Sequence, residues 1–282
     1  VQVTNLTTNY VYAPNAMTFG NTRLETQNSR LLGDIIFAYR KGGLADFIDA
    51  VQIKANFKGS KLGVLDLKRF YKELSGNDLI SFSGKMDGNL NDFDLNKLIV
   101  STEKGIRLIG DLSFKNAVNR ERGFVFNSDL NNLTATYSEL TDILPNVLGK
   151  ILPSELKKLG QFNIQGKVQV TPDKMEANVQ IQSQIGTVIT DLEIKDIDAI
   201  DTASYSGDIV FESFDIGALL NNPLFGEIFL KGQVIGRGFK LENVNTKFVG
   251  NISKFNLKGY PYKNITVNGQ YQNNKFDGGL VI

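Results

Sequence analysis

Residues 162–168 read Phe162-Asn-Ile164-Gln-Gly166-Lys-Val168, an alternation of apolar and polar residues with one glycine in the apolar register. Side chains alternate between the two faces of a β-strand, so this phrase predicts a strand with one apolar face. A glycine inside a strand often marks a bend or a close approach of another backbone. The phrase recurs in full or shortened form, and it places the expected bend glycines at Gly84, Gly110, Gly166, Gly207, Gly232 and Gly269. A sheet with glycines repeated on its apolar face is expected to curl toward that face.

The composition excludes most familiar catalytic chemistry. The 282 residues include no histidine, no cysteine and no tryptophan. Without histidine there is no imidazole base or histidine-ligated metal, and without cysteine there is no thiolate nucleophile, zinc knuckle or disulfide. The 31 basic and 30 acidic residues give a net charge of +1 and are dispersed along the chain. A surface for polyanions is therefore not expected, and nucleic acid is not an expected partner.

Membrane-spanning and signal segments are not expected within this sequence. Its longest apolar stretches fall far short of the roughly 20 residues that cross a bilayer as a helix, and no signal-peptide pattern opens it. The sequence starts and stops inside strand-like runs and has no initiator methionine. We therefore expect a soluble fragment of a longer protein.

Period-two alternation predicts antiparallel strands along most of the chain. It is clean over 51–58 and 175–182, where Gln, Lys, Asn and Glu face the opposite side from the apolar residues. Turn sequences such as Thr171-Pro-Asp-Lys174 separate neighbouring strands, so consecutive hairpins and roughly 16 to 18 strands are expected. The residues expected to line the apolar face are Val51, Ile53, Phe57, Ile80, Phe82, Phe162, Ile164, Val168, Val170, Met175, Val179, Ile181, Ile209, Phe211, Leu230, Val234, Ile265 and Val267.

Three helical segments are expected among the strands. Asp66 is predicted to cap a helix whose apolar residues are Leu67, Phe70, Tyr71 and Leu74. Asp215 is predicted to cap another, and a third stretch from about Tyr137 to Leu159 is broken by prolines. A helix followed by a glycine-containing strand thus starts near 66, 137 and 215, which indicates one continuous body over residues 1–282 built from repeats.

These helices are too few to cover the apolar face of so many strands, which limits the architectures. A two-sheet β-sandwich, a closed barrel and a curled sheet would each bury that face. Outer-membrane barrels have the reverse pattern, with apolar residues outside. The expected fold is therefore all-β with a few short helices, an elongated antiparallel sheet curled into an apolar groove, with a two-sheet β-sandwich as the alternative.

The order of the strand phrases also carries a resemblance to a known family. The passages Phe214-Asp-Ile-Gly-Ala-Leu-Leu-Asn-Asn-Pro-Leu-Phe-Gly226, Gly232-Gln-Val-Ile-Gly-Arg-Gly238 and Gly259-Tyr-Pro-Tyr-Lys-Asn-Ile-Thr-Val-Asn-Gly269 resemble the TamB branch of the AsmA-like family, in its Bacteroidota form. The earlier passage from Leu65 to Gly110 fits the same pattern. The resemblance covers most of the chain through the order and spacing of short strand phrases.

The resemblance implies a periplasmic protein anchored in the inner membrane, with a long apolar groove called a β-taco. The groove is expected to conduct phospholipids or other acyl-chain lipids between the inner and outer membranes during outer-membrane biogenesis. The family is also associated with translocation and assembly of outer-membrane proteins beside a TamA- or BamA-like barrel, so a scaffold or chaperone for such proteins is the alternative. The anchor and the region that meets the barrel are expected outside this chain.

Two other interpretations remain open from the residues alone. The apolar strand residues would show the same pattern if they formed only a packed core. An enzyme is disfavoured: Ser154 and Lys157 have the Ser-x-x-Lys spacing without the accompanying motifs. The aspartates of 92–96 and 196–201 lack the glycine and distal glutamate of a calcium loop. No catalytic residue, metal or cofactor is therefore expected.

Overall fold

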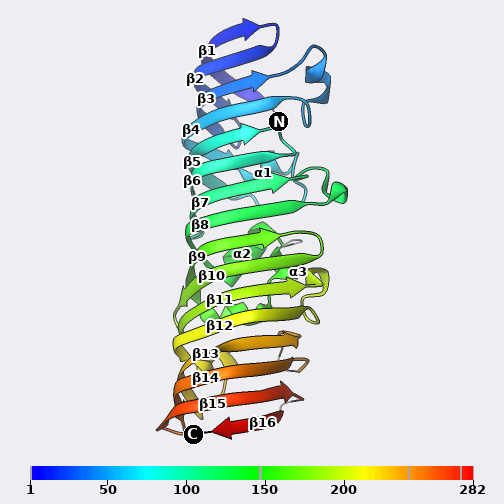
Figure 1. Ribbon diagram of the computed structural model, residues 1–282. Coiled ribbons are helices and arrows are strands. Elements are labelled where there is room, and N and C mark those ends of the chain that lie inside the picture. Colours follow the sequence, from blue (N-terminus) through cyan, green and yellow to red (C-terminus); the bar gives the residue numbers. More distant parts are fainter. Residues whose placement is uncertain (1, 146–147, 241, 274, 282) are drawn as a thin grey trace. The chain divides into compact units, whose positions relative to one another are not determined.

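The computed structural model describes residues 2–145, 148–240, 242–273 and 275–281. These residues form sixteen β-strands whose hydrogen-bonded order is the order of the sequence, from β1 to β16 (Figure 1). β1 and β16 each have one neighbour, so the sheet is not closed into a barrel. The prediction of an all-β fold of consecutive antiparallel hairpins is confirmed, and the strands belong to one sheet, unlike those of the alternative sandwich.

The chain divides into two compact units, which are described separately below. The first comprises Val1–Leu133, Asp142–Asn146 and Val170–Pro172, and the second comprises Thr134–Thr141, Val147–Gln169 and Asp173–Ile282. The first unit therefore contains β1 to β7 and most of β8. The second contains β9 without its last residue and β10 to β16, which pair in chain order like the strands of the first.

The first unit has eight strands with short helical segments between some of them. The strands are β1 (Val3–Ala13), β2 (Ala16–Thr26), β3 (Arg30–Ala38), β4 (Gln52–Gly63), β5 (Leu79–Gly88), β6 (Phe93–Thr102), β7 (Arg107–Lys115) and β8 (Val125–Thr136). The helical segments are η1 (Gly43–Asp46), α1 (Val64–Leu67) and η2 (Arg120–Arg122).

The second unit also has eight strands with short helical segments between some of them. Its strands are β9 (Gln161–Val170), β10 (Lys174–Ser183), β11 (Gly186–Lys195), β12 (Ser204–Asp215), β13 (Phe225–Arg237), β14 (Asn245–Leu257), β15 (Tyr260–Gln272) and β16 (Lys275–Val281). Its helical segments are most of α2 (Tyr137–Ile143), then α3 (Leu148–Ile151), η3 (Ser154–Leu159), η4 (Ile197–Ala199) and α4 (Ile216–Leu220).

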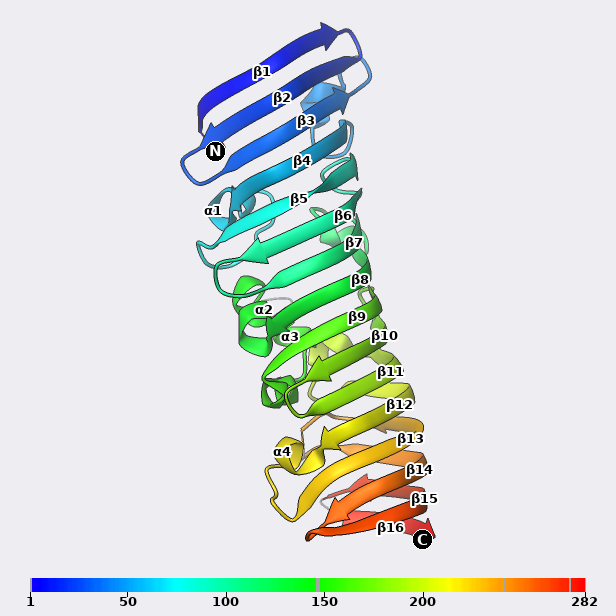
Figure 2. The same cartoon turned by 90° about the vertical axis from the view of Figure 1, so that its left-hand side faces the viewer.

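The helical segments recur with a period of four strands. An α-helical segment follows β4, β8 and β12, and a 3-10 segment follows β3, β7 and β11. Because the strands are antiparallel, the two kinds of segment lie at opposite strand ends. We call the end where odd-numbered strands finish rim A and the end where even-numbered strands finish rim B. Figure 2 shows α1 beside the ends of β4 and β5, and α4 beside the ends of β12 and β13.

A helical segment begins near each of the three expected places, but only one of the two expected caps is formed. The carboxylate of Asp215 accepts a 3.0 Å hydrogen bond from the amide of Ala218 and caps α4. The stretch after Tyr137 is broken into α2, α3 and η3, as expected from its prolines. The expected cap at Asp66 is wrong: α1 is one turn long with Gly63 at its N-cap, and Asp66 lies inside it. The carboxylate of Asp66 instead binds the β2–β3 turn, so it is not free to cap.

A line of β-bulges crosses the middle of the first unit. Register shifts occur in six consecutive strand pairs, near Thr7/Asn9 in β1, Phe19/Thr22 in β2, Arg30/Gly33 in β3, Phe57/Ser60 in β4, Ser83/Lys85 in β5 and Leu95/Leu98 in β6. A bulge bends its strand and increases the local twist. The extra residues lie in every second strand, in β2, β4 and β6, at matching positions along the strands, and we call this line of bulges the crease. Two of the expected bend glycines, Gly84 and Gly110, lie on it or beside it.

The two rims of the first unit are tied together across the apolar face. The segment 68–78, which we call the strap, leaves rim B after α1. Its Tyr71 hydroxyl donates a 3.1 Å hydrogen bond to the carbonyl of Leu90, in the β5–β6 turn on rim A. Glu73 of the strap lies 3.4 Å from the Nε of Arg120 in η2, also on rim A. The first unit is therefore a sheet bent at the crease, with its rims bridged by the strap.

Candidate functional site

Apolar side chains of the first unit form continuous rows across the strands. Directly paired residues of neighbouring strands have Cβ atoms about 4.5–5.5 Å apart, so their side chains touch. One row is Tyr12, Met17, Phe37, Ile53, Gly88, Phe93 and Phe114, and a second is Tyr10, Phe19, Ile35, Ala55, Met86, Leu95 and Leu112. We call the face that carries such rows the inner face.

Aromatic rings link several members of these rows. The ring centroids of Tyr10, Phe19, Phe37 and Phe47 follow one another at 5.2, 5.5 and 5.3 Å. Phe93 stacks on Phe114 at 4.8 Å. Phe57 contacts Phe82 at 5.2 Å, and both were expected on the inner face. Such pairs are favourable beyond their burial, so the aromatic contacts hold the inner face in a defined arrangement.

Near rim A the inner face of the first unit is a packed core. Ile35, Tyr39, Val51, Ile53 and Ala55 are buried there, and Val51 is 0% exposed. Phe47 and Leu90 from the loops of rim A pack against this cluster. Of the residues expected to line a groove, Val51 and Ile53 therefore belong to the core at this end, and Val51 precedes β4 rather than lying within it.

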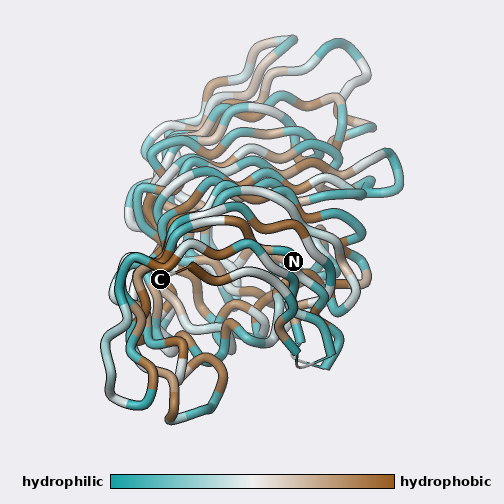
Figure 3. The backbone as a smooth tube through the Cα atoms, turned by 60° about the horizontal axis from the view of Figure 1, so that its bottom comes forward, coloured by the Kyte–Doolittle hydropathy of each residue, from teal (hydrophilic) through white to brown (hydrophobic). Residues whose placement is uncertain are grey.

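The second unit has a row of the same kind. Ile181, Val188, Phe211, Leu230, Ile252 and Ile265 pair in turn across β10 to β15. The next row toward rim A contains Val179, Thr190, Ile209, Gly232, Gly250 and Val267. Most residues of the opposite face are polar, although Ile189, Val210, Ile235 and Val249 also lie on it. Figure 3 shows the resulting alternation of hydrophobic and hydrophilic residues along the strands. The inner face of the second unit is thus apolar across six successive strands.

Neighbouring chain segments cover the glycines of the second unit closely. A Cβ added at Gly232 would lie 2.7 Å from the ring of Phe248, and one added at Gly269 would lie 2.3 Å from the ring of Phe276. At Gly166 the obstacle is the carbonyl oxygen of Asn178 in the following strand, at 2.2 Å, and at Gly207 it is the carbonyl oxygen of Asp191 in the preceding strand, at 1.9 Å. The glycines are therefore occupied positions rather than bare ones: rings or backbone atoms of the adjacent strand fill the space.

The expected lining residues fall on the inner face, and none is an exposed residue. Those fully buried are Val51, Ile53, Phe162, Met175, Val179, Ile265 and Val267, and the others are half-buried. Several members of the same rows were not predicted from the sequence, namely Phe37, Phe93, Phe114, Val188, Phe248 and Ile252. The signal was present for Phe93, which alternates with Asp94 and Leu95. It was weak in β3 and β11, where apolar residues follow one another directly.

A buried carboxylate fixes the foot of α1 to the β2–β3 turn. Asp66 accepts hydrogen bonds from the hydroxyls of Thr26 at 2.5 Å and Ser29 at 2.6 Å, and from the amide group of Asn28 at 3.3 Å. Burial raises the pKa of Asp66, and the bonds from Ser29, Thr26 and Asn28 outweigh it, so the pKa lies below its ordinary value. Asp66 is thus a structural anion at rim B.

The strap is held by a second buried group. The Tyr71 side chain points into the first unit, where burial raises its pKa to about 12. Its hydroxyl keeps its proton at physiological pH and donates to Leu90. The amide of Ser75 donates to the carbonyl of Ile143 at 2.8 Å, which ties the strap to the end of α2.

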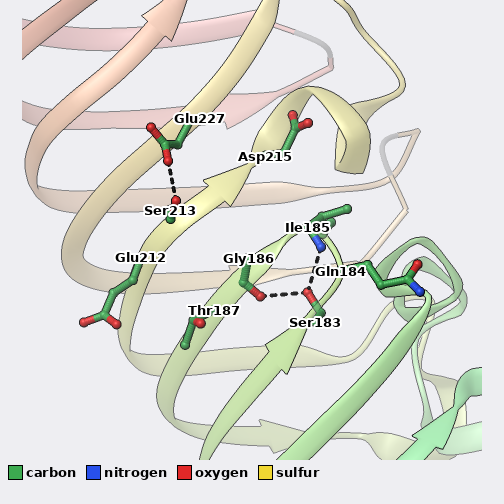
Figure 4. Close-up of a pocket in the computed structure, with 9 residues that line it drawn as sticks. All are labelled: Ser183, Gln184, Ile185, Gly186, Thr187, Glu212, Ser213, Asp215 and Glu227. Carbon is green, nitrogen blue, oxygen red and sulfur yellow. Dashed lines mark hydrogen bonds between the residues drawn. The ribbon is translucent and has the colours of Figure 1, made fainter.

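One pocket of the second unit is polar and separate from the rows. It has a volume of about 440 Å³ and is lined by Ser183, Gln184, Ile185, Gly186, Thr187, Glu212, Ser213, Asp215 and Glu227 (Figure 4). Glu227 is engaged by Ser213 and by Lys254 at 2.6 Å. Asp215 is the cap of α4. None of the residues expected to line a groove contributes to this pocket.

The motifs considered for catalysis or metal binding are not assembled into a site. Ser154 donates to its neighbour Glu155 at 3.2 Å, whereas the Nζ of Lys157 lies 5.2 Å from the centroid of the Tyr137 ring. Within the described residues, no group of three or more acidic side chains could hold a metal ion. The arrangement that the chain does build is an apolar inner face with polar rims.

Comparison of the chain with protein-family models, with curated proteins and with solved structures finds no match. Among the described residues, no helix has the length and apolar character needed to traverse a bilayer.

Proposed function

We propose that this chain is a segment of a periplasmic, TamB/AsmA-like protein whose inner face holds the acyl chains of phospholipids on their way between the inner and outer membranes. The observation that carries the proposal is the unbroken apolar row from Ile181 to Ile265 across β10 to β15. Together with the resemblance described above, this row favours a lipid over a polar ligand.

The dimensions of the row suit an acyl chain. Six strands at about 4.8 Å give a row about 24 Å long. One leaflet of a bilayer has about 15 Å of hydrocarbon, half of the roughly 30 Å core, so the row is longer than an acyl chain in a membrane. Each methylene group buried there would contribute about 0.8 kcal/mol. The row runs across the strands and contains no polar side chain, although Thr190 lies in the adjacent row toward rim A and Ser183 in the adjacent row toward rim B.

The same proposal assigns location and partners. The protein would be anchored in the inner membrane and would meet an outer-membrane barrel of the TamA or BamA type through regions outside this sequence. Its contribution would be outer-membrane biogenesis, with no catalytic step and no cofactor.

Mass spectrometry of organic extracts from the purified 282-residue chain tests the proposal. We expect co-purified phospholipid in stoichiometric amount, and loss of most of it in Ile265→Asp, which places a carboxylate in the row. Thr266→Asp is the matched control because Thr266 is the exposed neighbour on the opposite face. Circular dichroism must show that both variants are folded.

Two results would contradict the lipid proposal. One is a lipid-free, monodisperse wild type whose melting temperature does not respond to added phospholipid. The other is equal lipid content in Ile265→Asp and Thr266→Asp. A lipid-free chain that bound strand peptides of an outer-membrane barrel would instead support the scaffold or chaperone alternative.

A further inference from the structure

The strap and α1 present a basic and apolar surface to the solvent. Leu65 is 46% exposed and Phe70 is 45% exposed, although both are large apolar residues. Lys68, Arg69 and Lys72 lie within the same eight residues, and Lys72 is exposed. Single exposed apolar residues are normal on a protein surface. Here two large apolar side chains are partly exposed within the same short segment as three cations, which is typical of an interaction site.

The fold holds these side chains outward. Tyr71 is turned inward and bonded to Leu90, so its neighbours Phe70 and Lys72 cannot turn inward with it. Glu73 is paired with Arg120 on the opposite rim, and the amide of Ser75 is bonded to Ile143. The strap is therefore fixed directly after Phe70, and α1 before it is fixed by the hydrogen bonds of Asp66, so the outward surface is a built feature of the first unit.

The charge of this surface is not neutralised by the protein. Among the described residues, no carboxylate oxygen lies within 4.0 Å of a cationic nitrogen of Lys68, Arg69 or Lys72. The nearby acidic groups are already engaged: Asp66 by three hydrogen bonds, Glu73 by Arg120, and Asp78 by Lys104 at 3.0 Å. Arg30 and Lys61, directly paired on β3 and β4, add two more cations near the foot of α1.

We propose that this surface, formed by Leu65, Lys68, Arg69, Phe70 and Lys72, docks on a bilayer that contains anionic phospholipid. Clustered lysine and arginine are attracted to anionic headgroups, and aromatic and aliphatic side chains enter the interface beside them. An acidic protein would satisfy the cations but not the two apolar side chains that are held toward solvent. The inference does not depend on lipid bound to the inner face.

Vesicle flotation of the 282-residue chain tests this proposal. The vesicles contain phosphatidylcholine alone or phosphatidylcholine with one third phosphatidylglycerol. We expect flotation only with the anionic vesicles. It should be lost when salt rises from about 0.05 M to about 0.5 M, because the added salt screens the attraction between the basic side chains and the anionic headgroups. The triple variant Lys68→Gln, Arg69→Gln, Lys72→Gln should bind about 100-fold more weakly. Phe70→Ala should weaken binding at the lower salt concentration, because an apolar side chain is lost from the interface while the charges are kept.

The matched control is Lys85→Gln, Lys115→Gln, Lys231→Gln, which removes three exposed lysines from strands elsewhere. It changes the net charge equally and should float like the wild type. Equal loss in both triple variants would overturn the proposal, since it would show a response to net charge alone. Equal flotation with both kinds of vesicle would also overturn it, and so would retention on poly-glutamate without flotation, which would indicate an acidic protein partner. Lipid extraction reports on lipid bound to the inner face, whereas flotation reports on docking through the strap and α1. A negative result in one experiment therefore does not change the interpretation of the other.

Discussion

The backbone amide of Lys97 in β6 donates a 2.7 Å hydrogen bond to Oδ1 of Asp111 in β7. Lys97 is the extra residue of a bulge and has φ of +53°, a left-handed conformation that is uncommon for lysine. Asn21 donates to Asp34 at 2.9 Å and Gly59 donates to the Ser83 hydroxyl at 2.8 Å in the same way. At each of these bulges, an amide that the ladder leaves without a carbonyl is satisfied by a side chain of the next strand.

Removing that side chain should weaken the crease. We expect Asp111→Ala to lower the free energy of unfolding by about 1 kcal/mol, because the amide of Lys97 loses its acceptor. Urea unfolding measures the change. Asp208→Ala, at an exposed aspartate in the middle of β12, is the comparison and should change stability by less than about 0.5 kcal/mol. Equal losses in both variants would mean that the bond to Lys97 contributes nothing of its own.

Valine at the inner-face glycines should destabilise the protein although valine favours strands. Gly269→Val would collide with the ring of Phe276, and Gly166→Val would meet the carbonyl of Asn178 from a backbone at φ of +121°. We expect each to lower the free energy of unfolding by about 1–3 kcal/mol. Intrinsic strand propensity alone would raise it.

The chain offers a matched control for this pair. Gly279 lies in β16, and an added Cβ there would meet nothing within 4 Å. Gly279→Val should therefore be neutral or slightly stabilising. Thermal melts compare the three variants, and a rise in melting temperature in all three would show that the close approaches at Gly166 and Gly269 are easily relieved.

Two buried tyrosines should respond in opposite directions to loss of the hydroxyl. Tyr39 is 9% exposed, and its buried hydroxyl has no hydrogen-bond partner in the part of the chain that the structure describes. Tyr39→Phe should raise the free energy of unfolding by about 1 kcal/mol, since a buried unpaired polar group is removed. Tyr71→Phe should lower it by about 1 kcal/mol, because it breaks the bond to Leu90. Denaturant titration of both variants checks the signs, and a shared sign would refute this assignment.

Asp66 should make stability depend on pH in the acid range. Its pKa in the folded protein is below the ordinary value of 3.8, so its ionised form stabilises the fold above that value. The stabilisation is lost as the pH falls below 3.8 and through the lowered pKa of the folded state. Asp66→Asn should cost about 2 kcal/mol near neutral pH, where the carboxylate accepts its three bonds. The difference between wild type and variant should shrink toward pH 2 in urea unfolding series. A difference that stays constant with pH would assign the effect to packing.

The strands and their sidedness could be predicted from the sequence because a period of two is a local property. Gln161–Val170 and Lys174–Ser183 match the alternation that predicted them. Asp215 could be identified as a cap for the same reason, since its partner Ala218 is three residues away. Asp66 failed because its partners lie 37 to 40 residues earlier in the chain, and no local pattern records them.

The crease and the strap were also beyond local reasoning. A bulge at Lys97 depends on which residue of β7 lies opposite, and a lysine gives no sign of a left-handed backbone. Tyr71 was expected on the same helix face as Phe70, yet the two point to opposite sides because the segment leaves the helix after Leu67. The glycines were recognised, but the rings of Phe248 and Phe276 that lie against Gly232 and Gly269 come from the following strands.

Because the helical segments recur every four strands, the number of strands that can be added or removed without disturbing the pattern is restricted. Removing β5 to β8 with their connecting segments would join two strands that run in the same directions as before, and α1 would still leave from rim B. Removing three strands would reverse the chain direction of everything that follows, and the later helical segments would emerge at rim A, where 3-10 turns now stand. Removing two would keep the direction but bring two segments of one kind closer together. A chain built in this way keeps both its strand directions and the four-strand spacing of its helical segments only when it is lengthened or shortened in whole multiples of four strands.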